Sequence, residues 1–177
     1  ETTEETFNRL ENLLRWTRNQ NGKTKIYATL FNPTPVARQV VSLFSAIANA
    51  KEIELINRIE GKFDIFADED MIKTVLRNLI SNAIKFTYTG GQVELSLADS
   101  GDYWTIYVKD NGKGIPKDLQ AHLLKSDEYI TTYGTHNEKG SGLGLILCRD
   151  FIRMNKGKLH FYSQEGIGTT FYFTIPK

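Results

Sequence analysis

A helix with two different faces is the feature that most limits what this chain can fold into. The stretch RNLISNAIKF, residues 77–86, has apolar residues at helical spacing on one side and polar residues on the other. At about 100° per residue, Asn78, Asn82 and Lys85 fall within roughly 60° of one another. We expect this polar side to be either solvent-exposed surface or the wall of a site. The apolar side, which should face a core, comprises Ile72, Leu76, Leu79, Ile80 and Ala83.

Patterning along the rest of the chain predicts one α/β domain preceded by a helix. Thr34 and Asp68 are each expected to cap the helix that follows them. Residues 117–140 have no clear period and are predicted to form a long loop. Apolar periodicity predicts helices at 3–20, 32–52, 68–86 and 141–155, and strands at 26–31, 53–59, 63–67, 91–98, 103–110, 157–163 and 169–175.

Charge and cysteine content exclude several classes of function. The 22 basic and 21 acidic residues give a net charge of +1, so there is no electrostatic case for a nucleic-acid or anionic-membrane surface. The single cysteine, Cys148, provides neither a disulfide framework nor a zinc-binding spacing. No apolar run is long enough to cross a bilayer, and no signal-peptide pattern is present. Because the sequence starts already in helical rhythm, we expect it to be a piece of a longer protein.

Asp110 is the most informative single residue. It shares its parity with Trp104, Ile106 and Val108 on a predicted strand, so its side chain should point to their buried face. A buried carboxylate needs hydrogen-bond donors, and an adenine ring offers an exocyclic amine. The following glycines of DNGKGI, residues 110–115, allow a tight turn and the close approach of a flat ligand. The alternative interpretation is an ordinary Asp-Asn-Gly turn after a strand.

A second glycine-rich stretch, GSGLGL, begins at Gly140 where an apolar helix is predicted. The N-terminus of a helix carries N–H groups and partial positive charge, and glycines let phosphates come close to them. The spacing is neither that of a dinucleotide fold nor that of a Walker loop. A generic glycine-rich helix entry is the alternative. The third stretch, EGIGTTF, is by itself only a turn into the last strand.

Taken together and in this order, these stretches resemble the catalytic, ATP-binding domain of two-component histidine kinases, within the GHKL ATPase superfamily. NLISNAIKF resembles the N box, DNGKGI the G1 box, GSGLGL the G2 box and GIGTTF the closing glycine turn. The resemblance implies a two-layer α/β sandwich, the Bergerat or GHKL fold, with a mixed, mostly antiparallel sheet packed on about three helices. Residues 1–22 resemble the second helix of the dimerisation and phosphotransfer hairpin. Residues 23–177 would then be the catalytic domain, with an ATP lid at about 117–140.

The resemblance also implies roles for individual residues. Asn82, with Asn78 beside it, would ligate Mg²⁺ on the ATP phosphates, since a carboxamide oxygen is a hard, neutral ligand. Lys85 would offset phosphate charge, and Lys139 would contact the γ-phosphate. Asp110 would accept a hydrogen bond from the adenine amine. The other implied ATP-binding residues are Phe86, Gly112, Gly114, Ile115, Gly140, Ser141, Gly142, Leu143, Gly144 and Thr169.

The implied activity is transfer of the γ-phosphoryl group of Mg-ATP to a histidine, for relay to a response-regulator receiver domain. In the hydrolytic GHKL ATPases the N box typically starts with a glutamate that activates water. Asn78 occupies that position here and cannot act as a general base, which favours a kinase over an ATPase. A degenerate docking module without kinase activity is the other alternative, and the intact Asp110 argues against it.

None of the three histidines fits the phosphoacceptor of this family. His122 and His136 fall in the predicted lid, and His160 falls in a predicted strand. We therefore expect the chain to bind ATP without phosphorylating itself at the usual site. The acceptor helix, from its own or a partner subunit, would lie outside this chain. The resemblance implies a homodimeric, membrane-bound parent protein with this part in the cytoplasm, touching neither nucleic acid nor membrane.

Overall fold

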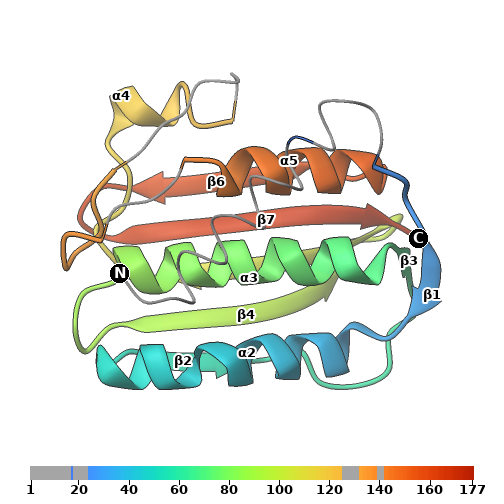
Figure 1. The fold of residues 1–177 in the computed structure, drawn as a ribbon, viewed down its shortest axis with the longest axis horizontal. Coiled ribbons are helices and arrows are strands. Elements are labelled where there is room, and N and C mark those ends of the chain that lie inside the picture. The colour runs from blue at the N-terminus through green and yellow to red at the C-terminus, as the bar shows by residue number, and fades with distance from the viewer. Residues whose placement is uncertain (1–16, 18–23, 125–131, 139–141) are drawn as a thin grey trace.

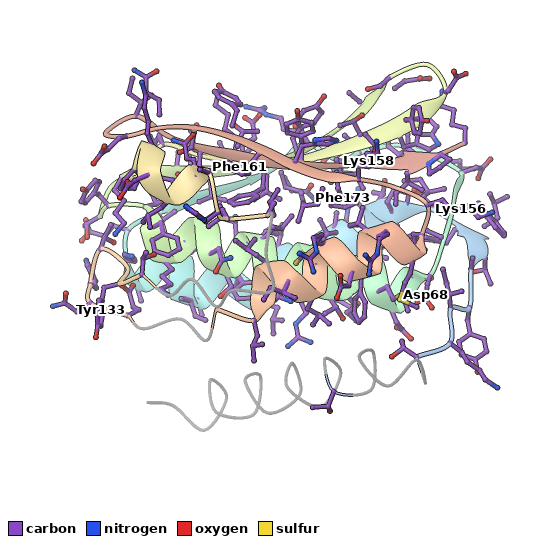
Figure 2. All side chains as sticks on the ribbon, turned by 90° about the horizontal axis from the view of Figure 1, so that it is seen from above. Asp68, Tyr133, Lys156, Lys158, Phe161 and Phe173 are labelled. Atoms are coloured by element: carbon purple, nitrogen blue, oxygen red, sulfur yellow. The ribbon has the colours of Figure 1, made fainter. Side chains whose placement is uncertain are left out.

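Two layers make up the fold, a sheet and a layer of helices on one of its faces. The computed structural model describes Thr17 and residues 24–124, 132–138 and 142–177, so the predicted helix at 3–20 lies outside the described residues apart from Thr17. Figures 1 and 2 show the three longer helices lying side by side against the sheet. The described helices are α2 (Pro33–Ala50), α3 (Glu69–Phe86), α4 (Lys117–Gln120) and α5 (Gly144–Met154).

The main sheet has five strands in the order β2-β4-β5-β7-β6. Its β2–β4 pair is parallel and its other pairs are antiparallel, so the sheet is mixed and mostly antiparallel, as the resemblance implied. Strands β1 and β3 form a separate two-stranded sheet, and β1 covers only the end of the strand predicted at 26–31. The strands are β1 (Thr29–Phe31), β2 (Glu54–Asn57), β3 (Ile65–Ala67), β4 (Gln92–Asp99), β5 (Tyr103–Asp110), β6 (Leu159–Gln164) and β7 (Gly168–Pro176).

Helix α3 forms as the sequence predicts. Asp68 caps it, since its Oδ1 accepts a hydrogen bond from the backbone N–H of Met71 at 3.1 Å. Glu69 and Asp70 in the first turn complement the positive end of the helix dipole. The whole predicted apolar side is buried, namely Ile72, Leu76, Leu79, Ile80 and Ala83.

Two local predictions are wrong at helix starts. Helix α2 begins one residue before the expected cap, because Pro33 takes the first helical position and Asn32 becomes the cap. The side chain of Asn32 accepts from the N–H of Thr34 at 3.2 Å, while the hydroxyl of Thr34 donates to Gly61 O at 2.8 Å. The helix predicted from residue 141 begins instead at Gly144.

The predicted loop at 117–140 is also not free of regular structure, because it contains the short helix α4.

The core lies between the sheet and the helices. Figure 2 shows Phe173 of β7 between the two layers, and it is fully buried together with Ile106 of β5. Helix α3 packs against both α2 and α5 and so occupies the middle of the helical layer. Within the described ranges, no helix has the length and apolar character that crossing a lipid bilayer requires.

Cys148 lies in this core and is expected to be chemically inert in the folded chain. It is completely buried on α5, and burial raises the pKa of its thiol far above the ordinary value. A thiol-specific chromogenic reagent should therefore react with one equivalent of thiol in denaturant and with almost none under native conditions. Rapid native labelling would show that α5 opens readily.

Candidate functional site

Asp110 ends β5 with its side chain buried, as its strand parity predicts; it is 7% exposed. Its Oδ1 accepts hydrogen bonds from the N–H of Gly112 at 2.9 Å and from the N–H of Thr169 at 3.2 Å. Among the described residues, none donates a hydrogen bond to Oδ2. Burial raises the pKa of Asp110 to about 6, against the opposing effect of the two N–H donors. The site thus holds a buried acceptor oxygen with capacity for one more donor.

A hydroxyl pair connects Asp110 to the first glycine loop. The hydroxyl of Thr169 lies 2.8 Å from that of Ser163 on β6. Ser163 also accepts from the N–H of Ile115 at 2.9 Å and donates to Gly168 O at 3.0 Å. Ser163 was not among the predicted site residues, because a serine in an alternating strand carries no signal by itself. It fixes the loop that follows Asp110 against the turn before β7.

The polar face of α3 meets the second glycine stretch. Asn78 is half-buried, and its Nδ2 donates to Thr74 O at 2.9 Å. A Cβ built on Gly144 would lie 2.9 Å from Asn78 Oδ1, so the first residue of α5 sits directly against this carboxamide. Gly142 precedes the helix at φ +71°, a left-handed conformation that favours glycine. The structure thereby brings the predicted NLISNAIKF and GSGLGL motifs together, with half-buried Asn82 one turn further along α3.

The end of α3 meets the first glycine loop. The N–H of Lys113 donates to Phe86 O at 3.0 Å. A Cβ on Gly112 would lie only 2.1 Å from the same Phe86 oxygen, so this position requires glycine. The ammonium groups of Lys85 and Lys113 lie 4.9 Å and 5.2 Å from the centre of the Phe86 ring. Lys113 was not among the predicted site residues, although it lies within the quoted motif.

Residues 132–138, the second described stretch of the predicted lid, are hydrogen-bonded to this same region. Lys113 Nζ donates to Tyr133 O at 2.6 Å, and the N–H of Thr135 donates to Lys85 O at 3.0 Å. The predicted contacts Lys139, Gly140 and Ser141 lie outside the described residues.

The arrangement has two chemically different ends. At one end, Oδ2 of Asp110 is a buried acceptor to which no described residue donates a hydrogen bond. At the other end are the half-buried carboxamides of α3 and the N-terminus of α5. Two cations lie around Phe86, at the end of α3 next to the first glycine loop. Such a site matches a ligand with a flat, amine-bearing ring and an anionic tail.

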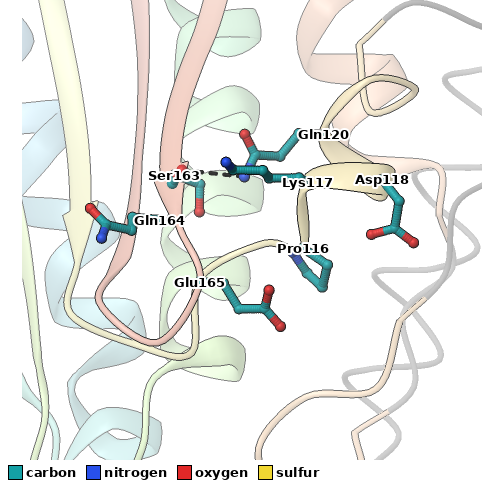
Figure 3. A pocket seen from close by; sticks show the side chains of 7 residues that line it. All are labelled: Pro116, Lys117, Asp118, Gln120, Ser163, Gln164 and Glu165. Carbon is teal, nitrogen blue, oxygen red and sulfur yellow. Dashed lines mark hydrogen bonds between the residues drawn. The ribbon is translucent and has the colours of Figure 1, made fainter.

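A cavity of about 490 Å³ lies beside α4, and it is not this site (Figure 3). Gln120 is one of its lining residues, and its Nε2 donates to Ser163 O at 3.2 Å and to Ile115 O at 2.6 Å. Its lining includes none of the predicted ligand-binding residues, although Gln120 and Ser163 connect it to Ile115 and Thr169 by hydrogen bonds. Its lining is Pro116, Lys117, Asp118, Gln120, Ser163, Gln164 and Glu165.

Comparison with known proteins gives a consistent picture. Residues 67–177 match the family described as histidine kinase-, DNA gyrase B-, and HSP90-like ATPase. The adaptive-response sensory kinase SasA of Crocosphaera subtropica is 30% identical over 173 residues, which are 96% of this chain and 45% of that protein. The chain thus spans less than half the length of this curated relative.

Solved structures of histidine kinases have the same fold. The catalytic domain of histidine kinase ThkA has a TM-score of 0.72 at 30% identity, covering 85% of this chain and 96% of that one. ThkA in complex with the response regulator protein TrrA has a TM-score of 0.74 at 25% identity, covering 98% and 49%. Full-length ShkA in complex with AMPPNP has a TM-score of 0.78 at 25% identity, covering 97% and 36%.

Proposed function

Because the chain belongs to the family of histidine kinase-, DNA gyrase B- and HSP90-like ATPases, we propose that it binds Mg-ATP at this site and serves as the catalytic part of a sensor histidine kinase. The observation that carries the proposal is Asp110, a buried carboxylate with one oxygen held by two N–H groups and the other open to a donor. The exocyclic amine of adenine is such a donor, and the glycines that follow let the ring approach closely.

The triphosphate would extend from Asp110 toward the polar face of α3 and the start of α5. Lys85 offsets phosphate charge, and Gly142, Leu143 and Gly144 present the helix N-terminus. Lys139, Gly140 and Ser141 are proposed to complete this part of the site. Gly112, Gly114 and Ile115 would shape the opposite wall together with Phe86 and Thr169.

The donor chemistry of α3 suits Mg²⁺. Asn82, with Asn78 next to it, offers neutral carboxamide oxygens, and magnesium takes few protein ligands when phosphates and waters supply the others. When bound, the ion would neutralise charge on the phosphate oxygens. The Nδ2 of Asn78 donates a hydrogen bond to Thr74 O at 2.9 Å, which fixes the orientation of this carboxamide on the wall of the site.

We propose phosphoryl transfer rather than hydrolysis. A carboxamide cannot remove a proton from water, so Asn78 gives the site no general base at the start of the N box. An acceptor imidazole on a helix outside this chain would attack the γ-phosphorus. The bond from the γ-phosphorus to the bridging oxygen would break, and ADP would leave with that oxygen. Catalysis would consist mostly of positioning and charge stabilisation. The match to a histidine kinase solved with a response regulator supports relay to a receiver domain as the next step.

Calorimetric titration with a non-hydrolysable ATP analogue, with and without Mg²⁺, tests this function. Wild type should bind, and Mg²⁺ should tighten binding by about tenfold or more, because the ion offsets repulsion on a charged triphosphate. Asn82→Ala should lose most of that enhancement while keeping its metal-free affinity. An absence of binding at millimolar nucleotide would contradict the proposal for this chain. If Asn82→Ala kept the Mg²⁺ enhancement, a residue other than Asn82 would have to ligate the metal.

A further inference from the structure

Lys51, at the end of α2, is a buried lysine that none of the motifs includes. Its side chain is only 7% exposed. Its ammonium group lies 3.0 Å from Ile84 O, 3.0 Å from Lys85 O and 3.0 Å from Glu138 Oε1. An ammonium has three N–H donors, so all of them are used. Burial of this charge is therefore compensated by partners from two other parts of the chain.

The first two partners belong to the last turn of α3. Carbonyls in the last turn of a helix have no partner within the helix, and a cation there also complements the negative end of the dipole. Lys51 thus caps the end of α3 that carries Lys85 and Phe86. The same Lys85 carbonyl accepts from the N–H of Thr135 at 3.0 Å, so one oxygen joins α2, α3 and the segment 132–138.

Glu138 organises that segment from the other side. Its Oε2 accepts from the N–H of His136 at 2.8 Å, and its backbone carbonyl accepts from the N–H of Gly134 at 2.9 Å. Burial opposes its ionisation, but hydrogen bonds from backbone N–H groups and from Lys51 prevail and hold the pKa of Glu138 below its ordinary value. The carboxylate is therefore ionised at neutral pH and pairs with Lys51. Residues 134–138 close into a compact turn around it.

We propose that the Lys51–Glu138 pair is a lid anchor, which holds residues 132–138 on the end of α3 and keeps this stretch of the lid in position for a triphosphate. The inference rests on the proposed function for its nucleotide part. Glu138 is four residues before Gly142, so the anchor holds the chain against the end of α3 shortly before the second glycine stretch. Lys51 acts through the lid and is a positioning residue. It therefore affects contacts to the end of the phosphate chain rather than the hydrogen bond to adenine.

Glu138→Gln tests the anchor, because it removes the charge and keeps the size of the side chain. The first measurement is amide hydrogen exchange in nucleotide-free protein. Exchange at Gly134, Thr135 and His136 should accelerate on the order of tenfold, since their N–H groups are held by the anchored turn. Glu94→Gln is the matched control, because it cuts the more exposed Arg58–Glu94 pair and should leave these amides unchanged. Unchanged exchange in Glu138→Gln would overturn the anchor.

The second measurement compares nucleotides. Glu138→Gln should lower the affinity for a triphosphate analogue with Mg²⁺ by a factor roughly fivefold larger than the factor by which it lowers the affinity for ADP. Lys51→Met should shift this ratio in the same direction, and the double variant should add little to either single change. An equal loss of affinity for both nucleotides would show that the pair acts only on the structure, and it would overturn the positioning role. If wild type bound no nucleotide, the proposed function and the positioning role would fail together, while the exchange measurement would still decide the anchor.

Discussion

Asp110→Asn is expected to weaken nucleotide binding by about 100-fold and at the same time to stabilise the fold. Asparagine keeps the oxygen that accepts from Gly112 and Thr169. It places an N–H donor where Oδ2 now stands, facing the donor amine of adenine. Losing one hydrogen bond and opposing two donors costs about 3 kcal/mol, or about 100-fold in affinity.

The stability effect follows from the buried charge. Folding raises the pKa of Asp110 from 3.8 to about 6, so the folded state binds more protons than the unfolded state between these values. Stability therefore falls as pH rises from about 4 to about 6, by at most about 3 kcal/mol, and stays reduced above that range. Asp110→Asn removes this cost. Its free energy of unfolding should exceed that of wild type at pH 8 and approach it near pH 4.

Urea unfolding at several pH values and calorimetry with an ATP analogue measure both effects. Asp99→Asn is the matched control, since it makes the same change at an exposed carboxylate whose pKa is lowered by its hydrogen bond to Lys177. That variant should bind nucleotide like wild type. Nearly unchanged affinity in Asp110→Asn would exclude this carboxylate as the adenine acceptor. A less stable variant at pH 8 would show that its charge is better compensated than burial implies.

Gly168→Ala is expected to be the most damaging change in the last turn. Gly168 has φ +143°, and a Cβ there would lie 2.1 Å from the backbone oxygen of Asp110. Backbone atoms cannot move aside as a flexible side chain can. The clash would push apart β5 and β7, where Thr169 donates to Asp110 Oδ1. We expect a loss of about 3 kcal/mol or more in the free energy of unfolding, and weakened nucleotide binding.

Gly166→Ala separates the clash from the backbone conformation. Gly166 lies two residues earlier at φ +78°, and a Cβ there would meet nothing within 4 Å. Only the strain of a left-handed residue applies, about 1 kcal/mol. Urea unfolding of both variants under one condition compares them directly. Equal losses would mean that conformation alone, and not the contact with Asp110, makes Gly168 necessary.

Local pattern accounts for the parts of the site that the sequence predicts. Helical periodicity sets Asn78 and Asn82 opposite the buried side of α3, and strand parity turns Asp110 inward with Ile106. Both arguments need only the geometry of one element, because the direction of a side chain follows from its position in the repeat. The boundaries of helices were less predictable. Both Asn32 and Thr34 are residue types that cap helices, and Asn32 is the cap because Pro33 takes the first helical position.

The sequence by itself determined the two-faced helix, the inward carboxylate and the order of the glycine stretches. Only the tertiary structure decided which groups meet across elements. A lysine at a helix end, such as Lys51, is expected in solvent, and it is buried here because the carbonyls of α3 and the carboxylate of Glu138 converge on it. Ser163 likewise joins the site only because β6 pairs with β7. Repeats fix directions within an element, whereas the partners of a polar group depend on where distant backbone is placed.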